Sequence, residues 1–226
     1  MKRNEKKHLW TGIWLLLAFL LWTLLIRCVD VQAAGPNGTK VGLAVFNLWF
    51  HNLTGVHMTI YTITDWLGLV PIVVCLGFGM VGVFQLFQRR SLLRVDPDII
   101  LLGLYYILVI LGYLIFEMVP INYRPILISG ALEASYPSST TLLVLSVMPT
   151  LKFQIDRRTE KQFVRNATGL FVTAFSAFMV IGRLLSGVHW ATDIIGAILL
   201  SMGLFLIYRY SVDLADQRKE AANGIQ

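Results

Sequence analysis

The feature of this sequence that most limits its fold is a series of long apolar runs. They lie at residues 9–27, 63–87, 98–116, 138–151, 167–181 and 190–208. About 20 apolar helical residues cross the roughly 30 Å hydrocarbon core of a bilayer. The runs therefore predict six membrane helices. The fourth and fifth runs are short, so we expect their helices to extend into the flanking polar residues.

The expected fold is all-α: a polytopic membrane protein built as a six-transmembrane-helix bundle, with an interfacial helix on its outer side. We expect one membrane domain over residues 1–226. Its parts would be a cytoplasmic tail at 1–8, the bundle at 9–210 and a second cytoplasmic tail at 211–226. With 56% hydrophobic and 14% charged residues, the composition agrees with a membrane protein. The two cysteines have neither metal-site nor disulfide-framework spacing.

The distribution of basic residues predicts the orientation. If the N-terminus is cytoplasmic, alternating loops place fifteen of the 19 Lys and Arg residues inside. Only Arg27, Lys40, Arg124 and Arg183 then lie outside. Positive loops resist translocation, so both termini are expected in the cytoplasm and the protein in the cell membrane. The net charge of +6 is thereby explained by loop placement, and no nucleic-acid partner is expected.

The first apolar run has two interpretations. The segment VQAAG at 31–35 offers small residues at plausible signal-peptidase positions. However, the apolar core from Leu9 to Ile26 exceeds the 7 to 15 residues of a signal-peptide core. The run therefore favours an uncleaved anchor.

The segment 40–62 mixes aromatic and polar residues, including Trp49 and Phe50. Aromatic side chains favour headgroup depth, so this segment predicts the interfacial helix on the outer surface. His51 and His57 lie in it, but nothing near them completes a ligand set. We interpret them as polar residues on a wet face, and no metal site is expected.

Two outer loops carry unusual polar residues: residues 117–141 and the stretch GRLLSGVHWATD at 182–193. If the last helix begins near His189, then Asp193 lies one turn along on the same face. A carboxylate there can hold one imidazole nitrogen and leave the other free to react. This is the base and orienter arrangement of nucleophilic catalysis.

The same loops hold groups that suit phosphate. Guanidinium groups such as Arg124 and Arg183 bind phosphoryl oxygens and neutralise developing charge. Ser138 lies just ahead of the fourth helix, near its positive end. Ionisable residues at membrane depth are costly, and their convergence from two loops predicts a phosphate site.

These residues carry a family resemblance. Arg183-x5-His189-x3-Asp193, preceded by Tyr-Pro-Ser-Ser at 136–139 and Arg-Pro at 124–125, resembles the type 2 phosphatidic acid phosphatase superfamily, in its membrane lipid phosphatase branch. Its signature reads Lys-x6-Arg-Pro, then Pro-Ser-Gly-His, then Ser-Arg-x5-His-x3-Asp. The match covers about residues 60–210.

The resemblance implies roles for these residues. His189 would attack phosphorus to form a phosphohistidine, and Asp193 would orient it. Arg124, Ser138 and Arg183 would hold the phosphate. No cofactor or metal is implied, so we expect activity that survives chelation.

The sequence departs from the family pattern at four positions. Glu117 replaces the lysine of the first motif. Ser139 and Thr140 replace the glycine and the histidine of the second motif, and Gly182 replaces the serine before the arginine of the third motif. The missing histidine protonates the leaving oxygen in the family. An alcohol needs that proton more than a leaving phosphate does, so we expect a preference for a lipid pyrophosphate, such as a polyprenyl diphosphate.

Two roles are open for the acidic residues. Glu117 or Glu133 could replace the missing acid, or Glu117 could simply neutralise Arg124.

Three functions remain open from the sequence. The first is a lipid phosphate or pyrophosphate phosphatase. The second is a phosphotransferase that passes the phosphoryl group to a lipid or sugar hydroxyl. The third is a catalytically silent relative that binds or moves a phosphorylated lipid. The expected partners are a phosphorylated lipid and the bilayer, and the sequence indicates no oligomeric state.

Overall fold

A computed structural model of the chain describes residues 3–223. Its helices are α1 (Arg3–Cys28), α2 (Ala44–Thr54), α3 (Met58–Leu67), α4 (Leu69–Arg89), α5 (Pro97–Met118), α6 (Ser139–Arg158), α7 (Gln162–Leu185) and α8 (Ala191–Asn223), with 3-10 turns η1 (Pro36–Gly38) and η2 (Leu92–Arg94). Across the described residues no strand forms, and only three isolated β-bridges occur. The all-α prediction is confirmed.

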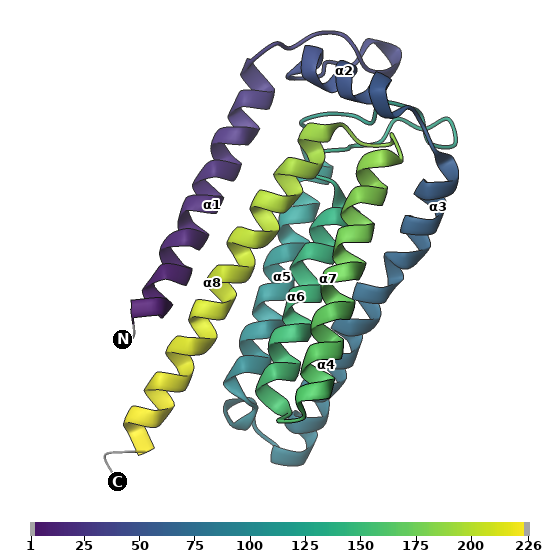
Figure 1. Cartoon of the computed structure of the whole chain (residues 1–226). Helices are drawn as coiled ribbons and strands as arrows, with labels where there is room; N and C mark the ends of the chain where they lie inside the picture. Colours follow the sequence, from purple (N-terminus) through teal and green to yellow (C-terminus); the bar gives the residue numbers. More distant parts are fainter. Residues whose placement is uncertain (1–2, 224–226) are drawn as a thin grey trace.

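Five stretches of helix are long and apolar enough to cross a membrane: α1, α3 with α4, α5, α7 and α8. The sixth helix, α6, is more polar, but its 20 residues rise about 30 Å. It lies between its neighbours in the middle of the bundle (Figure 1), and eight of its residues are buried. Because other helices surround α6, it need not be apolar all round. The six-helix bundle is confirmed.

Several helix ends differ from the expected boundaries. As predicted, α6 and α7 extend beyond their apolar runs. The expected tails, by contrast, are largely helical: α1 already begins at Arg3, and α8 continues to Asn223. A helix can continue past its apolar run because its backbone hydrogen bonds form within the helix and do not require apolar side chains. Residues 1, 2 and 224–226 of the expected tails lie outside the described part of the chain.

The first helix is an integral part of the bundle. It runs beside α8 along one flank (Figure 1). The two backbones approach closely at Gly203, where an added Cβ would lie 2.7 Å from Leu16. Trp22 also donates through Nε1 to the carbonyl of Thr192, at 3.1 Å. Without α1, this face of α8 would be uncovered.

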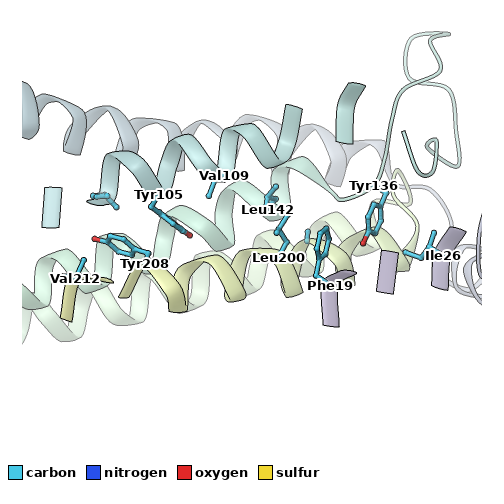
Figure 2. Close-up of a cluster of buried hydrophobic side chains, with 11 residues drawn as sticks. Phe19, Ile26, Tyr105, Val109, Tyr136, Leu142, Leu200, Tyr208 and Val212 are labelled. Atoms are coloured by element: carbon cyan, nitrogen blue, oxygen red, sulfur yellow. The ribbon is translucent and has the colours of Figure 1, made fainter. Parts of the chain in front are cut away.

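The main core cluster runs along the inner face of α8 (Figure 2). At one end, Tyr105 stacks on Tyr208 with ring centroids 5.0 Å apart. At the other end, Tyr136 packs against Phe19, and its hydroxyl bonds the Thr23 hydroxyl at 2.7 Å. The core thus holds the segment just before α6 against α1 and α8.

The end of the bundle away from both termini is covered by α2 (Figure 1). Val45, Trp49 and Leu53 on this helix are exposed, whereas Asn47 is fully buried. The amphipathic pattern agrees with the predicted interfacial helix, but the helix is shorter than the segment 40–62. It ends at Gly55, whose φ of 70° stops the helix, and residues 58–62 belong to α3.

Candidate functional site

The two polar loops predicted from the sequence meet at the end of the bundle that carries α2. They enclose a cavity of about 90 Å³. The residues around it are Tyr113, Phe116, Glu117, Arg124, Glu133, Ala134, Ser135, Tyr136, Pro137, Ser139 and His189. Its lining is largely polar and its volume suits a headgroup rather than a lipid chain.

A glycine positions the loop between α7 and α8. Gly187 has a φ of 70°, which favours glycine. A Cβ at this position would also lie 2.1 Å from the carbonyl oxygen of Gly55. The loop therefore packs directly on the junction of α2 and α3, where the Ser186 carbonyl accepts from the backbone N–H of His57 at 3.0 Å.

His189 lies in this loop, two residues before α8 begins at Ala191. The helix therefore starts about half a turn after the expected position near His189. The imidazole Nδ1 is 3.1 Å from the carbonyl oxygen of Ser135. A carbonyl can only accept, so Nδ1 carries the hydrogen and Nε2 carries the lone pair. Nε2 is buried without a hydrogen-bond partner among the described residues.

Asp193 holds the turn that carries His189. Its Oδ2 accepts the backbone N–H of Trp190 at 2.9 Å, and the Asn122 amide lies 3.4 Å from Oδ1. The first contact is the reach-back half of a capping box at the start of α8. Oδ2 is also 3.8 Å from Nδ1 of His189. Asp193 is thus close enough to stabilise positive charge on the ring, while the Ser135 carbonyl makes the nearer contact.

The surroundings keep His189 neutral. Burial lowers the pKa of His189 below its usual range, and the nearby Arg124 and Arg183 act in the same direction. Asp193 opposes this shift. The protonated ring is disfavoured in the fold, so lowering the pH below the ordinary histidine pKa costs stability rather than adding it. A neutral imidazole with a free Nε2 is the form needed for nucleophilic attack.

Arg124 lines the same cavity as His189. The guanidinium Nε is 3.0 Å from Oε2 of Glu133, an ion pair in which the N–H does not point at the carboxylate. Nη1 is buried without a partner in the described structure. Arg124 therefore keeps donors available for a ligand although its charge is partly offset.

Arg183 is almost fully buried on α7 and is held by α3. Its Nη2 donates to Asp65 at 3.1 Å and also to the Thr140 hydroxyl. The guanidinium lies 4.9 Å from the ring centroid of Tyr61, and that of Arg124 lies 5.9 Å from the same ring. Nε of Arg183 has no partner in residues 3–223. The two arginines thus converge on one aromatic ring, but only Arg124 reaches the cavity.

The predicted phosphate ligand Ser138 does not line the cavity. Its hydroxyl donates to Thr141 at 3.0 Å, and its backbone N–H bonds the Asp193 carbonyl at 3.2 Å. The next residue, Ser139, does line the cavity and opens α6. The first N–H groups of a helix have no intrahelical acceptor and favour anions. The first residue of α6 therefore lies at the cavity, one position after the residue expected to bind phosphate.

Of the four altered signature positions, Glu117 and Thr140 lie in different places. Glu117 lines the cavity with His189, in the last turn of α5. Thr140 lines a neighbouring apolar cavity and bonds Arg183. Neutralisation of Arg124 by Glu117, one of the two roles left open by the sequence, is not seen, since the ion-pair partner of Arg124 is Glu133.

Sequence reasoning missed the contribution of α3. Tyr61 and Asp65 both contact Arg183, and Thr64 lies 3.4 Å from it. A signal was present, because Asp65 is an acidic residue inside an apolar run, where ionisable groups are rare. The Ser135 carbonyl was also missed, and no side-chain pattern could have indicated it. Among residues 3–223, no group of three or more potential metal ligands occurs.

Fold and site together define a class: a multi-pass helical membrane protein with a buried polar cavity at one end of the bundle. The model of the PAP2 superfamily matches residues 100–216, which is more than half of the chain. The chain therefore belongs to the PAP2 superfamily, and the resemblance drawn from the signature residues is confirmed.

The fold is also similar to a crystal structure, that of the first transmembrane PAP2 type phosphatidylglycerolphosphate phosphatase from Bacillus subtilis. The TM-score is 0.60 and the sequence identity 18%, over 88% of this chain and 94% of that chain. A comparison with curated protein sequences finds no match.

Proposed function

We propose that the chain is a membrane phosphatase that removes phosphate from a lipid phosphate or lipid diphosphate through a phosphohistidine at His189. The observation that carries this proposal is the free Nε2 of His189, buried in a polar cavity with Arg124. A buried acceptor without a partner costs about 1 to 3 kcal/mol. A fold keeps such an atom where a ligand or a reaction uses it.

In the first step, Nε2 attacks phosphorus, an N–P bond forms, and the bond from phosphorus to the leaving oxygen breaks. The leaving group departs with the electron pair. Nδ1 keeps its hydrogen, so the ring becomes positive, and Asp193 at 3.8 Å stabilises that charge. In the second step water attacks phosphorus, the N–P bond breaks, and phosphate leaves. Arg124 and the start of α6 offset the charge on the phosphoryl oxygens.

A lipid substrate is supported by a second cavity. It has a volume of about 260 Å³, is largely apolar, and shares Tyr113 and Ser139 with the polar cavity. A phosphorylated head in the polar cavity would place the first part of its chain there. Because Thr140 does not supply the proton that a histidine would, lipid diphosphates should react faster than phosphate monoesters.

The decisive experiment uses purified protein and a radiolabelled lipid diphosphate. Because the N–P bond of a phosphohistidine hydrolyses in acid, the reaction is quenched in alkaline SDS, and we expect labelled protein there. His189→Ala should abolish the label and lower turnover by about 10³-fold or more. His57→Ala is the matched control, since His57 lies outside the cavity, and it should keep both. Turnover of phosphatidic acid equal to that of the diphosphate would contradict the proposed preference.

The orientation in the membrane is part of the proposal. The termini lie at the end of the bundle opposite α2 (Figure 1), and the cavity lies at the α2 end. Most basic residues lie in the tails and in the loops of the end with the termini. This supports a cavity at the outer face and cytoplasmic termini. Cys28 is exposed where α1 ends near α2, so an impermeant thiol reagent should label it on intact cells. Labelling only after lysis would indicate the opposite orientation in the membrane.

A second candidate is a phospholipid-binding relative without catalysis. One observation favours it: each arginine has a carboxylate partner, Glu133 for Arg124 and Asp65 for Arg183. Phosphotransfer to a lipid or sugar hydroxyl needs the same residues as hydrolysis. Product analysis with added acceptors separates transfer from hydrolysis, and ligand binding without any label on His189 would identify the silent relative.

A further inference from the structure

A groove opens at the opposite half of the bundle from the candidate active site. Its floor is α6 and its walls are α7 and α8, which pack on α6 but make few contacts with each other. The groove has a volume of about 430 Å³. Pro149 of α6 lies in its floor and has no N–H to donate to the carbonyl of Leu145. On the α7 wall, the small side chains of Thr173 and Ser176 leave the space open.

The length of the groove along the helix axes matches the thickness of one membrane leaflet. Its α6 residues run from Leu145 to Asp156, a rise of about 16 Å at 1.5 Å per residue. This is about half of the hydrocarbon core. The deeper part is mainly apolar, with Leu145 and Val172 beside the small hydroxyl side chains of α7. The charged residues Lys152, Asp156 and Arg209 line the part nearer the termini.

The charged end of the groove favours an anion. Arg209 lies over the Phe153 ring at 5.7 Å, and its Nε is buried without a hydrogen-bond partner in the described structure. The acidic lining residue, Asp156, is already paired with Lys152 and, at 3.2 Å, with Arg165. The groove thus presents a basic donor beside a carboxylate that two cations already neutralise.

We propose that this groove binds one anionic phospholipid from the leaflet on the side of the termini. The phosphate of the lipid accepts from Arg209 near the membrane surface, and one acyl chain fills the apolar part beside Pro149. Two observations select a lipid over a soluble anion: the apolar depth of the groove and the position of its basic residues at one end only. The site is separate from the His189 cavity and does not depend on the proposed reaction.

The test is native mass spectrometry of detergent-purified protein that has been equilibrated with equal amounts of phosphatidylglycerol and phosphatidylcholine. Wild-type protein should retain one phosphatidylglycerol in at least fivefold preference. Arg209→Gln combined with Lys152→Gln should remove that preference and leave phosphatidylcholine adducts unchanged. Arg94→Gln is the matched control, because Arg94 is an exposed basic residue outside the groove, and it should behave as wild type.

Two further measurements complete the test. Ser176→Phe fills the groove from α7 and should displace the lipid without removing a charge; circular dichroism checks that this variant folds. Inorganic phosphate, added at millimolar concentration, should not displace phosphatidylglycerol. Displacement by phosphate would identify a soluble-anion site, and equal retention of both lipids would show that the headgroup is not recognised; either result overturns the proposal.

Discussion

The two ends of the bundle differ in how far their charged residues are paired with one another. At the end with the termini, Asp98 accepts from Arg158 at 2.8 Å and lies 3.6 Å from Arg157. Arg157 in turn makes two hydrogen bonds to Asp216, at 2.7 and 3.0 Å. These acidic and basic side chains satisfy one another within the fold, and the unpartnered Nε of Arg209 in the lipid groove is the exception at this end.

At the end with the cavity, buried groups remain unsatisfied. Nε2 of His189, Nη1 of Arg124 and Nε of Arg183 have no hydrogen-bond partner in the described part of the chain. Since each such group costs free energy, this end is less stable than it could be. The comparison teaches that charge alone does not mark a site; buried polar atoms left without partners do.

The largest effect is expected when a cavity arginine is removed. Arg124→Ala should lower kcat/KM for a lipid diphosphate by about 10²- to 10³-fold, because a donor to the developing phosphoryl charge is lost. Arg157→Ala, a change at the opposite end, serves as the comparison and should leave kcat/KM of the folded protein near wild type. Steady-state phosphate release measures both. A similar loss in the two variants would remove the contrast between the ends.

Glu117 gives the next effect. Its carboxylate lines the cavity without an ion pair in residues 3–223, and it repels a phosphate. Glu117→Lys restores the family residue and changes the local charge by two, so we expect kcat/KM to rise about tenfold. Glu117→Gln should give a smaller rise. A loss of turnover in both variants would instead assign Glu117 as the proton donor to the leaving group.

Asp65 pairs with Arg183, so its removal tests how far this carboxylate offsets the charge of Arg183. Asp65→Asn keeps an acceptor for Arg183 but removes the negative charge. Phosphate should then inhibit more strongly, with a Ki about fivefold lower, a modest effect because the Asp65 side chain is 58% exposed. Thr62→Ala, on the exposed side of α3, is the control. Weaker inhibition by phosphate would mean that Asp65 chiefly holds Arg183 in position.

The smallest effect on turnover is expected at the end with the termini, where Asp98 and Arg158 form an ion pair. Asp98→Asn leaves Arg158 without its charged partner and should lower the free energy of unfolding by about 2 kcal/mol. Turnover per folded molecule should stay unchanged. Asp216→Asn breaks a more exposed pair and should lower the melting temperature less. Thermal melts in detergent, read beside activity, check both; a drop in turnover for Asp98→Asn would couple the two ends.

Much of the fold could be predicted because its signals are local. Length and apolarity placed the membrane helices, and α6 was found although it is the most polar of the six. The helix ends were less predictable, since α8 continues well beyond its apolar run. A polar helix can continue into water or along other helices, and the sequence pattern does not distinguish these cases.

The site was partly predictable for a related reason. Signature spacing placed His189 and Arg124 together, and both line one cavity. Ser138 was predicted as a phosphate ligand, whereas the residue that lines the cavity is its neighbour Ser139. The distinction depends on which way the first turn of α6 faces, and this is fixed by the Ser138 contacts with Asp193 and Thr141.

The membrane bundle, the family and the loop that carries His189 follow from the sequence alone, because long apolar runs and short motif spacings can be recognised along the chain. The surroundings of each charged group depend on the tertiary structure. Arg183 and Asp65 are 118 residues apart in the chain, and the His189 ring is oriented by a backbone carbonyl 54 residues away. Such contacts follow from how helices pack, so they leave no period or spacing in the sequence.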